Sequence, residues 1–228
     1  MPRYRQALPQ LSDRLFVTDG GIETTLIFLN RRAIALIASF RLRPELQQRE
    51  VVLSGNIGPR GDGYVPGAMM SVNQAADYHA EQITTFAATD ADLVSAFTIN
   101  YTEEAIGIAR AAGWLGMPAV ISFTVETDGK LPTGESLQAA IERTDLATDG
   151  YPAYYMINCA HPSHFQDALL PGSQWYGGRR SGSDGKDGND GNDGTVATVP
   201  TADTVPTTTA RPWPPDPPPP RHPRGRRR

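Results

Sequence analysis

Residues 154–164 read YYMINCAHPSH, and this stretch decides how the rest of the chain is interpreted. It begins as a short run of apolar, β-prone residues and ends in a polar cluster that contains Pro162, a pattern typical of a buried strand that runs into a loop. Cys159, the only cysteine of the sequence, lies at that corner. Catalytic and binding residues commonly lie at the carboxyl ends of parallel strands, so a thiol there is well placed for chemistry. A buried structural cysteine is the alternative, because free cysteine is among the most buried residue types.

The preceding sequence alternates between strand patterns and helix patterns. Such alternation indicates βα units and a parallel sheet. With the strand before Cys159 the chain supplies five strands, whereas a closed (β/α)₈ barrel needs eight. The predicted fold class is therefore α/β, an incomplete (β/α)₈ TIM-type barrel with a disordered C-terminal tail. The other predicted strands are 15–18, 51–55, 92–99 and 119–125, and the predicted helices are 30–40, 71–89, 103–112 and 136–146.

Ser71 is expected to cap the helix over 71–89, and the predicted core-facing residues of that helix are Ala75, Tyr78, Ile83 and Phe86. The glycine-rich loop over 56–67 has neither the GxGxxG spacing nor the Lys-Ser/Thr of a P-loop, which excludes a nucleotide site of either kind.

Composition indicates one domain with a substantial core, since 39% of the 228 residues are hydrophobic. The net charge of −4 conceals two unlike parts. Residues 179–228 carry nine basic and six acidic residues, which leaves 12 basic and 19 acidic residues before them. An acidic body does not suit nucleic-acid binding.

A single cysteine excludes an internal disulfide, so nothing in the sequence indicates an oxidising compartment. Residues 1–16 contain no apolar stretch of signal-peptide length, and the longest apolar run, 33–40, is too short to cross a bilayer. The sequence therefore predicts a cytoplasmic protein with no membrane and no nucleic-acid partner. Homo-oligomerisation is left open.

The composition changes after residue 177. Glycine recurs at every third position from 182 to 194, but only five times and without proline, so a collagen helix is excluded. The interleaved aspartates lack EF-hand spacing and are interpreted as a solvated linker. Thr-rich, Pro-rich and Arg-rich segments follow, none able to bury enough apolar surface to order itself. The predicted domains are a partial barrel over 1–178 and a disordered low-complexity tail over 179–228.

Several motifs, in the order in which they occur, resemble the homocysteine S-methyltransferase family. The first is Thr-Asp-Gly-Gly after the first predicted strand, and the last is the Ile-Asn-Cys that ends the Cys159 strand. The resemblance extends from Leu15 to about Leu170. The matching segments are 18–21, 54–61, 78–86, 90–93, 103–105 and 157–159.

This resemblance implies a (β/α)₈ barrel enzyme that transfers a methyl group from a donor to the sulfur of homocysteine, as in methionine synthesis. It also implies zinc as the cofactor that holds and activates that sulfur. A thiol with a pKa of about 8.5 is mostly protonated at neutral pH, and metal coordination yields the nucleophilic thiolate. The implied small-molecule partners are homocysteine and a methyl donor, whose identity the sequence leaves open.

The resemblance also assigns site residues. Cys159 matches a zinc ligand, and Asp19, Gly20 and Gly21 match the lining of the homocysteine pocket. Asn158 is expected to support the substrate site. Glu126, at the end of the strand before it, is proposed as a partner for the substrate amine. No catalytic residue beyond these is assigned.

The sequence departs from the family pattern in three places. The two further zinc ligands of the family are adjacent cysteines in a Gly-Gly-Cys-Cys motif, and this chain has no second cysteine. A segment that precedes the helix near Asn30 is missing, as in an internal deletion. Phe97 stands where many members carry a substrate-binding glutamate. A non-catalytic remnant of the family is therefore the alternative to an active methyltransferase.

Cys159, His161 and His164 together are an alternative candidate for a metal site. The spacing C-x-H-x₂-H allows it in principle. The two histidines flank Pro162 in a polar loop, which favours solvent-facing residues over ligands.

Overall fold

The computed structural model describes residues 2–9, 27–46, 50–165 and 197–200. Within these ranges four strands form a parallel sheet in sequence order: β1 (Ser54–Ile57), β2 (Leu93–Ile99), β3 (Ala119–Phe123) and β4 (Tyr154–Ile157). A fifth strand, β5 (Ala197–Pro200), pairs with β4 in the antiparallel sense. The α/β class and the parallel order of the predicted strands in this part of the chain are confirmed. The strand predicted over 15–18 lies outside the described residues.

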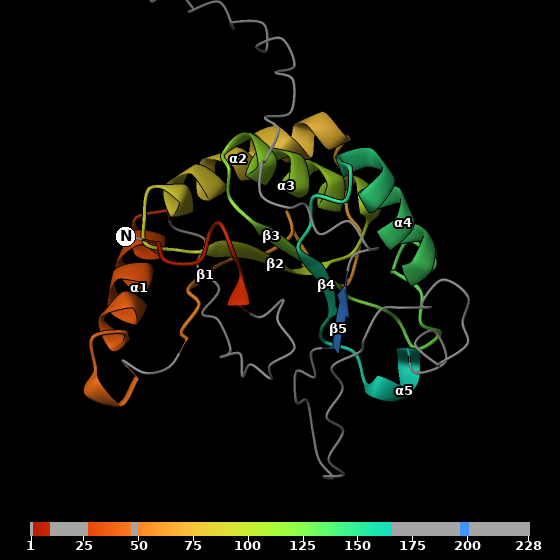
Figure 1. Cartoon of the computed structure of the whole chain (residues 1–228). Helices are drawn as coiled ribbons and strands as arrows, with labels where there is room; N and C mark the ends of the chain where they lie inside the picture. Colours follow the sequence, from red (N-terminus) through yellow and green to blue (C-terminus); the bar gives the residue numbers. More distant parts are fainter. Residues whose placement is uncertain (1, 10–26, 47–49, 166–196, 201–228) are drawn as a thin grey trace, which may run out of the picture.

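Helices connect the parallel strands, as βα units require. They are α2 (Val72–Ala87), α3 (Thr102–Trp114) and α4 (Leu137–Thr148), and all three lie over one face of the sheet (Figure 1). Helix α1 (Ile27–Phe40) and the short helix η2 (Pro44–Leu46) precede β1, and α5 (Pro162–Phe165) follows β4. No helix within the described ranges is long and apolar enough to span a membrane.

Apolar residues of the strands alternate between two cores because successive strand residues point to opposite faces. The larger core lies between the sheet and its helices, with Val94, Ile121 and Tyr155 among its buried residues. The smaller core lies on the opposite face, which would be the interior of a barrel. It contains Leu93, Val120, Tyr154 and Met156, with Leu8 and Phe97 packed against it.

Helix α2 begins with the predicted cap. Ser71 accepts a hydrogen bond from the Gln74 amide, while the Gln74 side chain accepts one from the Ser71 amide. The prediction that Tyr78 faces the core is wrong, because Tyr78 is 52% exposed. The buried residue is the neighbouring His79. One residue corresponds to a rotation of about 100° on a helix, so the apolar face passes through His79 and not through Tyr78.

The strand β5 lies in the segment that was expected to have no regular structure. Its four residues pair with Tyr154–Ile157, the open edge of the parallel sheet. An unpaired strand edge presents a row of free amides and carbonyls that accepts an extended segment without demanding a particular sequence. The other residues of the tail beyond 178 lie outside the described residues.

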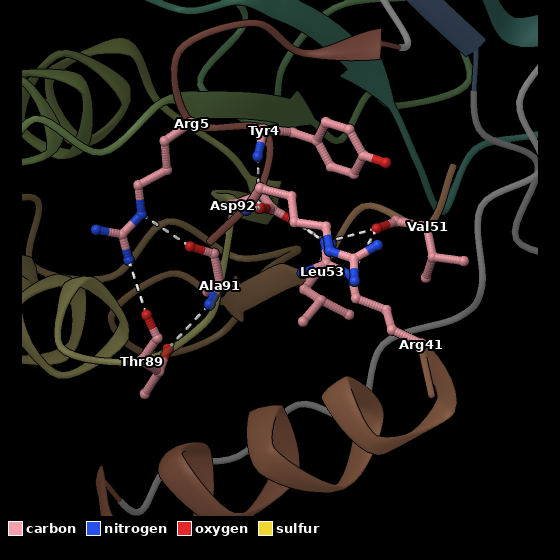
Figure 2. A network of polar contacts seen from close by, with 9 residues as sticks. Tyr4, Arg5, Arg41, Val51, Leu53, Thr89, Ala91 and Asp92 are labelled. Atoms are coloured by element: carbon pink, nitrogen blue, oxygen red, sulfur yellow. Dashed lines mark hydrogen bonds and ion pairs between the residues drawn. The ribbon is translucent and has the colours of Figure 1, made fainter. Parts of the chain in front are cut away.

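A polar network closes the amino-terminal end of the strands (Figure 2). The buried Asp92, just before β2, accepts hydrogen bonds from the amides of Arg3, Tyr4 and Leu53 and from the Arg41 guanidinium. This network ties the N-terminal residues to the sheet at the end opposite Cys159. The barrel end at which strands begin serves stability, and the end at which they finish carries sites.

Candidate functional site

Asn158 is the centre of a buried polar cluster just past the end of β4. Its side-chain oxygen accepts hydrogen bonds from the Thr98 amide at 3.0 Å and from the Ser122 hydroxyl at 2.6 Å. Its side-chain nitrogen donates to the Thr98 hydroxyl at 3.0 Å and to the Cys159 sulfur at 3.1 Å. The carboxamide is therefore satisfied on both ends and fixes the carboxyl ends of β2, β3 and β4 to one another.

Thr98 is held in an uncommon backbone conformation. Its φ is 59°, and β-branched residues rarely adopt positive φ. The pairing register between β2 and β3 shifts between Ala96 and Ile99, so Thr98 lies in a bulge. Strained residues persist only where the surroundings enforce them, and they gather at functional sites. Here Asn158 supplies two of the enforcing hydrogen bonds.

Cys159 also has a positive φ, of 56°, and its side chain is exposed. The interpretation of Cys159 as a buried structural cysteine is therefore wrong. The strand ends at Ile157, and the turn at Cys159 brings the sulfur beside the Asn158 amide. A thiol in this place is open to solvent and touched by a hydrogen-bond donor.

The two histidines that follow do not join Cys159 in a metal site. The His161 ring nitrogen Nδ1 lies 2.8 Å from the Ser163 hydroxyl, and its ring centroid is 5.9 Å from that of His164. In the part of the chain that the structure describes, no group of three or more His, Cys, Asp or Glu side chains is arranged to hold a metal ion. Among these residues the ligand set consists of one thiol.

The other residues expected at the site do not join the Asn158 cluster within the part of the chain that the structure describes. Asp19, Gly20 and Gly21 lie outside the described residues. Glu126 is exposed in the loop after β3, at the same end of the sheet as Asn158, and no hydrogen bond between the described residues joins the two. Phe97, which stands where many members of the resembling family carry a glutamate, packs against the smaller core and brings no carboxylate to this end of the sheet.

The loop over 58–71, between β1 and α2, covers the end of β2. The Asp62 carbonyl accepts a hydrogen bond from the Asn100 side chain at 2.9 Å. A Cβ added to Gly63 would lie 2.5 Å from the Thr98 methyl group, so the glycine backbone is pressed against Thr98. This loop is thus a direct neighbour of the Asn158 cluster.

Two buried polar side chains hold the same loop from the helix side. Glu104, which is fully buried, accepts hydrogen bonds through Oε1 from the Arg60 amide at 2.7 Å and from His79 Nε2 at 2.9 Å. The Tyr101 hydroxyl accepts one from the Met70 amide. Burial raises the pKa of Tyr101 and the neighbouring Glu104 adds to this rise, while the Met70 hydrogen bond opposes it.

Sequence reasoning missed Thr98, Ser122, His79 and Glu104. A usable signal existed for the last two: His79 follows Ala75 and precedes Ile83 at spacings of four, and Glu104 precedes Ile108 by four. A polar residue on an apolar helix face is expected to be buried and paired. The partnership of Asn158 with residues 60 and 36 positions away gives no comparable signal.

Comparison with known proteins agrees with this architecture. The sequence model of the family described as Homocysteine S-methyltransferase matches residues 12–176. The metallated form of the homocysteine methyltransferase MmuM from Escherichia coli is similar in fold, with a TM-score of 0.53 at 20% identity, over 63% of this chain and 52% of that one. Its apo form matches with a TM-score of 0.47 at 19% identity, over 67% of this chain and 58% of that one.

The chain thus spans about half the length of the solved structures that it resembles. None of the curated proteins matches it in sequence. The family match covers most of the chain and includes the β4 corner with Asn158 and Cys159. The chain belongs to the homocysteine S-methyltransferase family.

Proposed function

We propose that this chain is a homocysteine S-methyltransferase by descent, with a site for homocysteine at the carboxyl ends of β2, β3 and β4. The observation that carries the proposal is the Asn158 cluster. A fixed carboxamide there joins three strand ends beside an exposed thiol, in a family whose members act on homocysteine. Ligands of parallel α/β proteins bind at this end of the strands.

Zinc is the cofactor that the family implies, and the residues described here do not fit it. A catalytic zinc site takes three protein ligands and leaves one position for substrate. The described residues bring one thiol to the site, and the whole sequence contains no second cysteine. We therefore assign Cys159 to the metal-ligand position of the family, as a single ligand that cannot complete such a site by itself.

In this proposal Asn158 orients the substrate end of the site, and Asp19, Gly20, Gly21 and Glu126 contact the amino-acid part of homocysteine. Glu126 carries a negative charge on an exposed loop at the correct end of the sheet, which suits an ammonium group. The incomplete ligand set favours the second candidate function, a family member that binds homocysteine without turning it over.

The test uses the purified full chain with homocysteine and zinc, and with betaine, S-methylmethionine or a methyl folate in separate reactions. Binding is measured by calorimetry and product by the amount of methionine formed. We expect homocysteine binding that is weakened by Asn158→Ala and unchanged by the surface substitution Asn73→Ala, with slow or no methionine formation. Absence of homocysteine binding would contradict the proposal. Binding without any methionine would select the non-catalytic function.

A further inference from the structure

We propose that Glu104, which lies outside the strand-end site, is a positioning residue. Through the 58–71 loop it fixes the backbone conformation of Thr98 and the orientation of the Asn158 side chain. The ligand named in this inference, homocysteine, rests on the proposed function. The positioning itself rests only on contacts among described residues.

Glu104 anchors the loop at the Arg60 amide. Glu104 lies in the first turn of α3 and is fully buried. A buried carboxylate costs folding free energy that an apolar residue would avoid. Its Oε1 contacts are the Arg60 amide, which belongs to the loop, and His79 on α2, which holds the carboxylate in place.

Beyond Arg60 the loop runs directly to the end of β2. Two residues later the Asp62 carbonyl receives the Asn100 hydrogen bond, and Gly63 meets the Thr98 methyl group. The Asp62 carboxylate accepts hydrogen bonds from the amides of Tyr64 and Val65, which turns the chain tightly at this point. Only Gly61 separates Arg60 from Asp62, so a displacement of Arg60 acts on the Asp62 and Gly63 contacts over a very short stretch of chain.

Thr98 is the residue through which the loop contacts the Asn158 cluster. Thr98 keeps a positive φ that its own side chain disfavours, so it depends on its neighbours. Gly63 presses on it from the loop, and Asn158 holds its amide and hydroxyl from β4. Release of the loop would let Thr98 relax, and Asn158 would lose its two hydrogen bonds to Thr98 and keep the one from Ser122.

The test is amide hydrogen exchange, followed by NMR, of the full chain and of Glu104→Ala. The Arg60 amide reports the anchor, the Thr98 amide reports the site, and the Ile121 amide in the middle of β3 reports the global fold. We expect exchange at Arg60 and Thr98 to accelerate by about tenfold or more with Ile121 unchanged. Glu104→Gln, which keeps an acceptor oxygen, should restore most of the protection. Glu103→Ala, on the exposed side of the same turn, should leave all three amides unchanged.

Acceleration at Arg60 alone, or equal acceleration at all three amides, would overturn the inference, as would no change. If Glu104→Ala does not fold, Asn100→Ala releases the Asp62 carbonyl instead, and the Thr98 amide should again respond without Ile121. In the homocysteine titration, Glu104→Ala should raise the Kd about tenfold while Glu103→Ala does not. If the unaltered chain binds no homocysteine, the proposed function fails while the exchange pattern still decides the positioning role.

Discussion

Arg41 and Asp92 form an ion pair that is almost wholly buried, with the Arg41 side chain 6% exposed and the Asp92 side chain fully buried (Figure 2). Arg41 also donates to the Val51 carbonyl at 2.8 Å, and its guanidinium lies over the Tyr4 ring. The pair therefore joins the end of α1, the approach to β1 and the N-terminal residues. Both carboxylate oxygens of Asp92 accept two hydrogen bonds each, so its replacement leaves several donors without an acceptor.

We expect Asp92→Ala to lower the free energy of unfolding by about 3–5 kcal/mol, because it leaves the Arg41 charge buried and unpaired. Urea denaturation followed by circular dichroism measures this change. Asp128→Ala is the matched control, since Asp128 is 59% exposed and its contact with Lys130 spans 3.6 Å. A surface pair of this kind contributes at most about 1 kcal/mol. Equal effects of the two substitutions would contradict the structural role of Asp92.

Gly107 sets the closest approach of α2 and α3. A Cβ at this position would lie 2.5 Å from the Ala75 methyl group and 2.7 Å from the Ala76 amide nitrogen, neither of which can move without shifting a helix. Gly107→Ala should therefore destabilise the protein by about 1–3 kcal/mol despite the better helix propensity of alanine. Gly113→Ala on the same helix meets only the Tyr151 ring at 3.4 Å and should be neutral or slightly stabilising. Thermal unfolding of both variants decides this, and a stabilised Gly107→Ala would refute the packing argument.

Much of the fold could be predicted because apolar periodicity is local. Helix α3 was expected over 103–112 and spans Thr102–Trp114, and β3 was expected over 119–125 and spans Ala119–Phe123. The start of β1 was placed too early, at residue 51. The carbonyls of Val51 and Leu53 bond instead to the Arg41 side chain and to the amides of Asp92 and Leu93, which are tertiary contacts.

The site was predictable only in part, because its hydrogen bonds join residues that are far apart in the sequence. Asn158 and Cys159 stand together in the sequence at a recognisable strand end. Their partners Thr98 and Ser122 are ordinary strand residues until β2, β3 and β4 are placed in register, and the bulge at Thr98 is a consequence of that placement. Likewise, nothing local separates the buried Glu104 from the half-buried Glu103 except the direction in which the apolar face of α3 points.

Tyr151 gives a prediction in the alkaline range. Burial raises its pKa to about 12, and its hydroxyl donates to the Met117 carbonyl at 3.0 Å. In the unfolded chain the phenol loses its proton near pH 10, so between about pH 10 and 12 the folded state binds more protons than the unfolded state. The stabilisation is complete below pH 10 and is lost as the pH rises through this window, by an amount on the order of 2 kcal/mol. Tyr151→Phe should be less stable at neutral pH and should lack this part of the alkaline loss. Parallel loss in both proteins, in urea midpoints measured at about pH 9 and pH 11, would contradict the assignment.

The last prediction concerns zinc and Cys159. The sulfur is exposed beside Asn158, no second cysteine exists in the sequence, and His161 Nδ1 is engaged with Ser163. Thiolates supply most of the binding free energy of a zinc site of this type, and a single ligand does not hold the ion against water or a competing chelator. Titration of the purified chain with zinc in the presence of a chromogenic chelator, beside Cys159→Ala, should therefore show weak binding by both proteins. Tight stoichiometric binding that Cys159→Ala abolishes would mean that other residues complete the ligand set, either in parts of the chain that the structure does not describe or across an oligomer. Zinc binding that is tight and indifferent to the substitution would remove Cys159 from the metal site altogether.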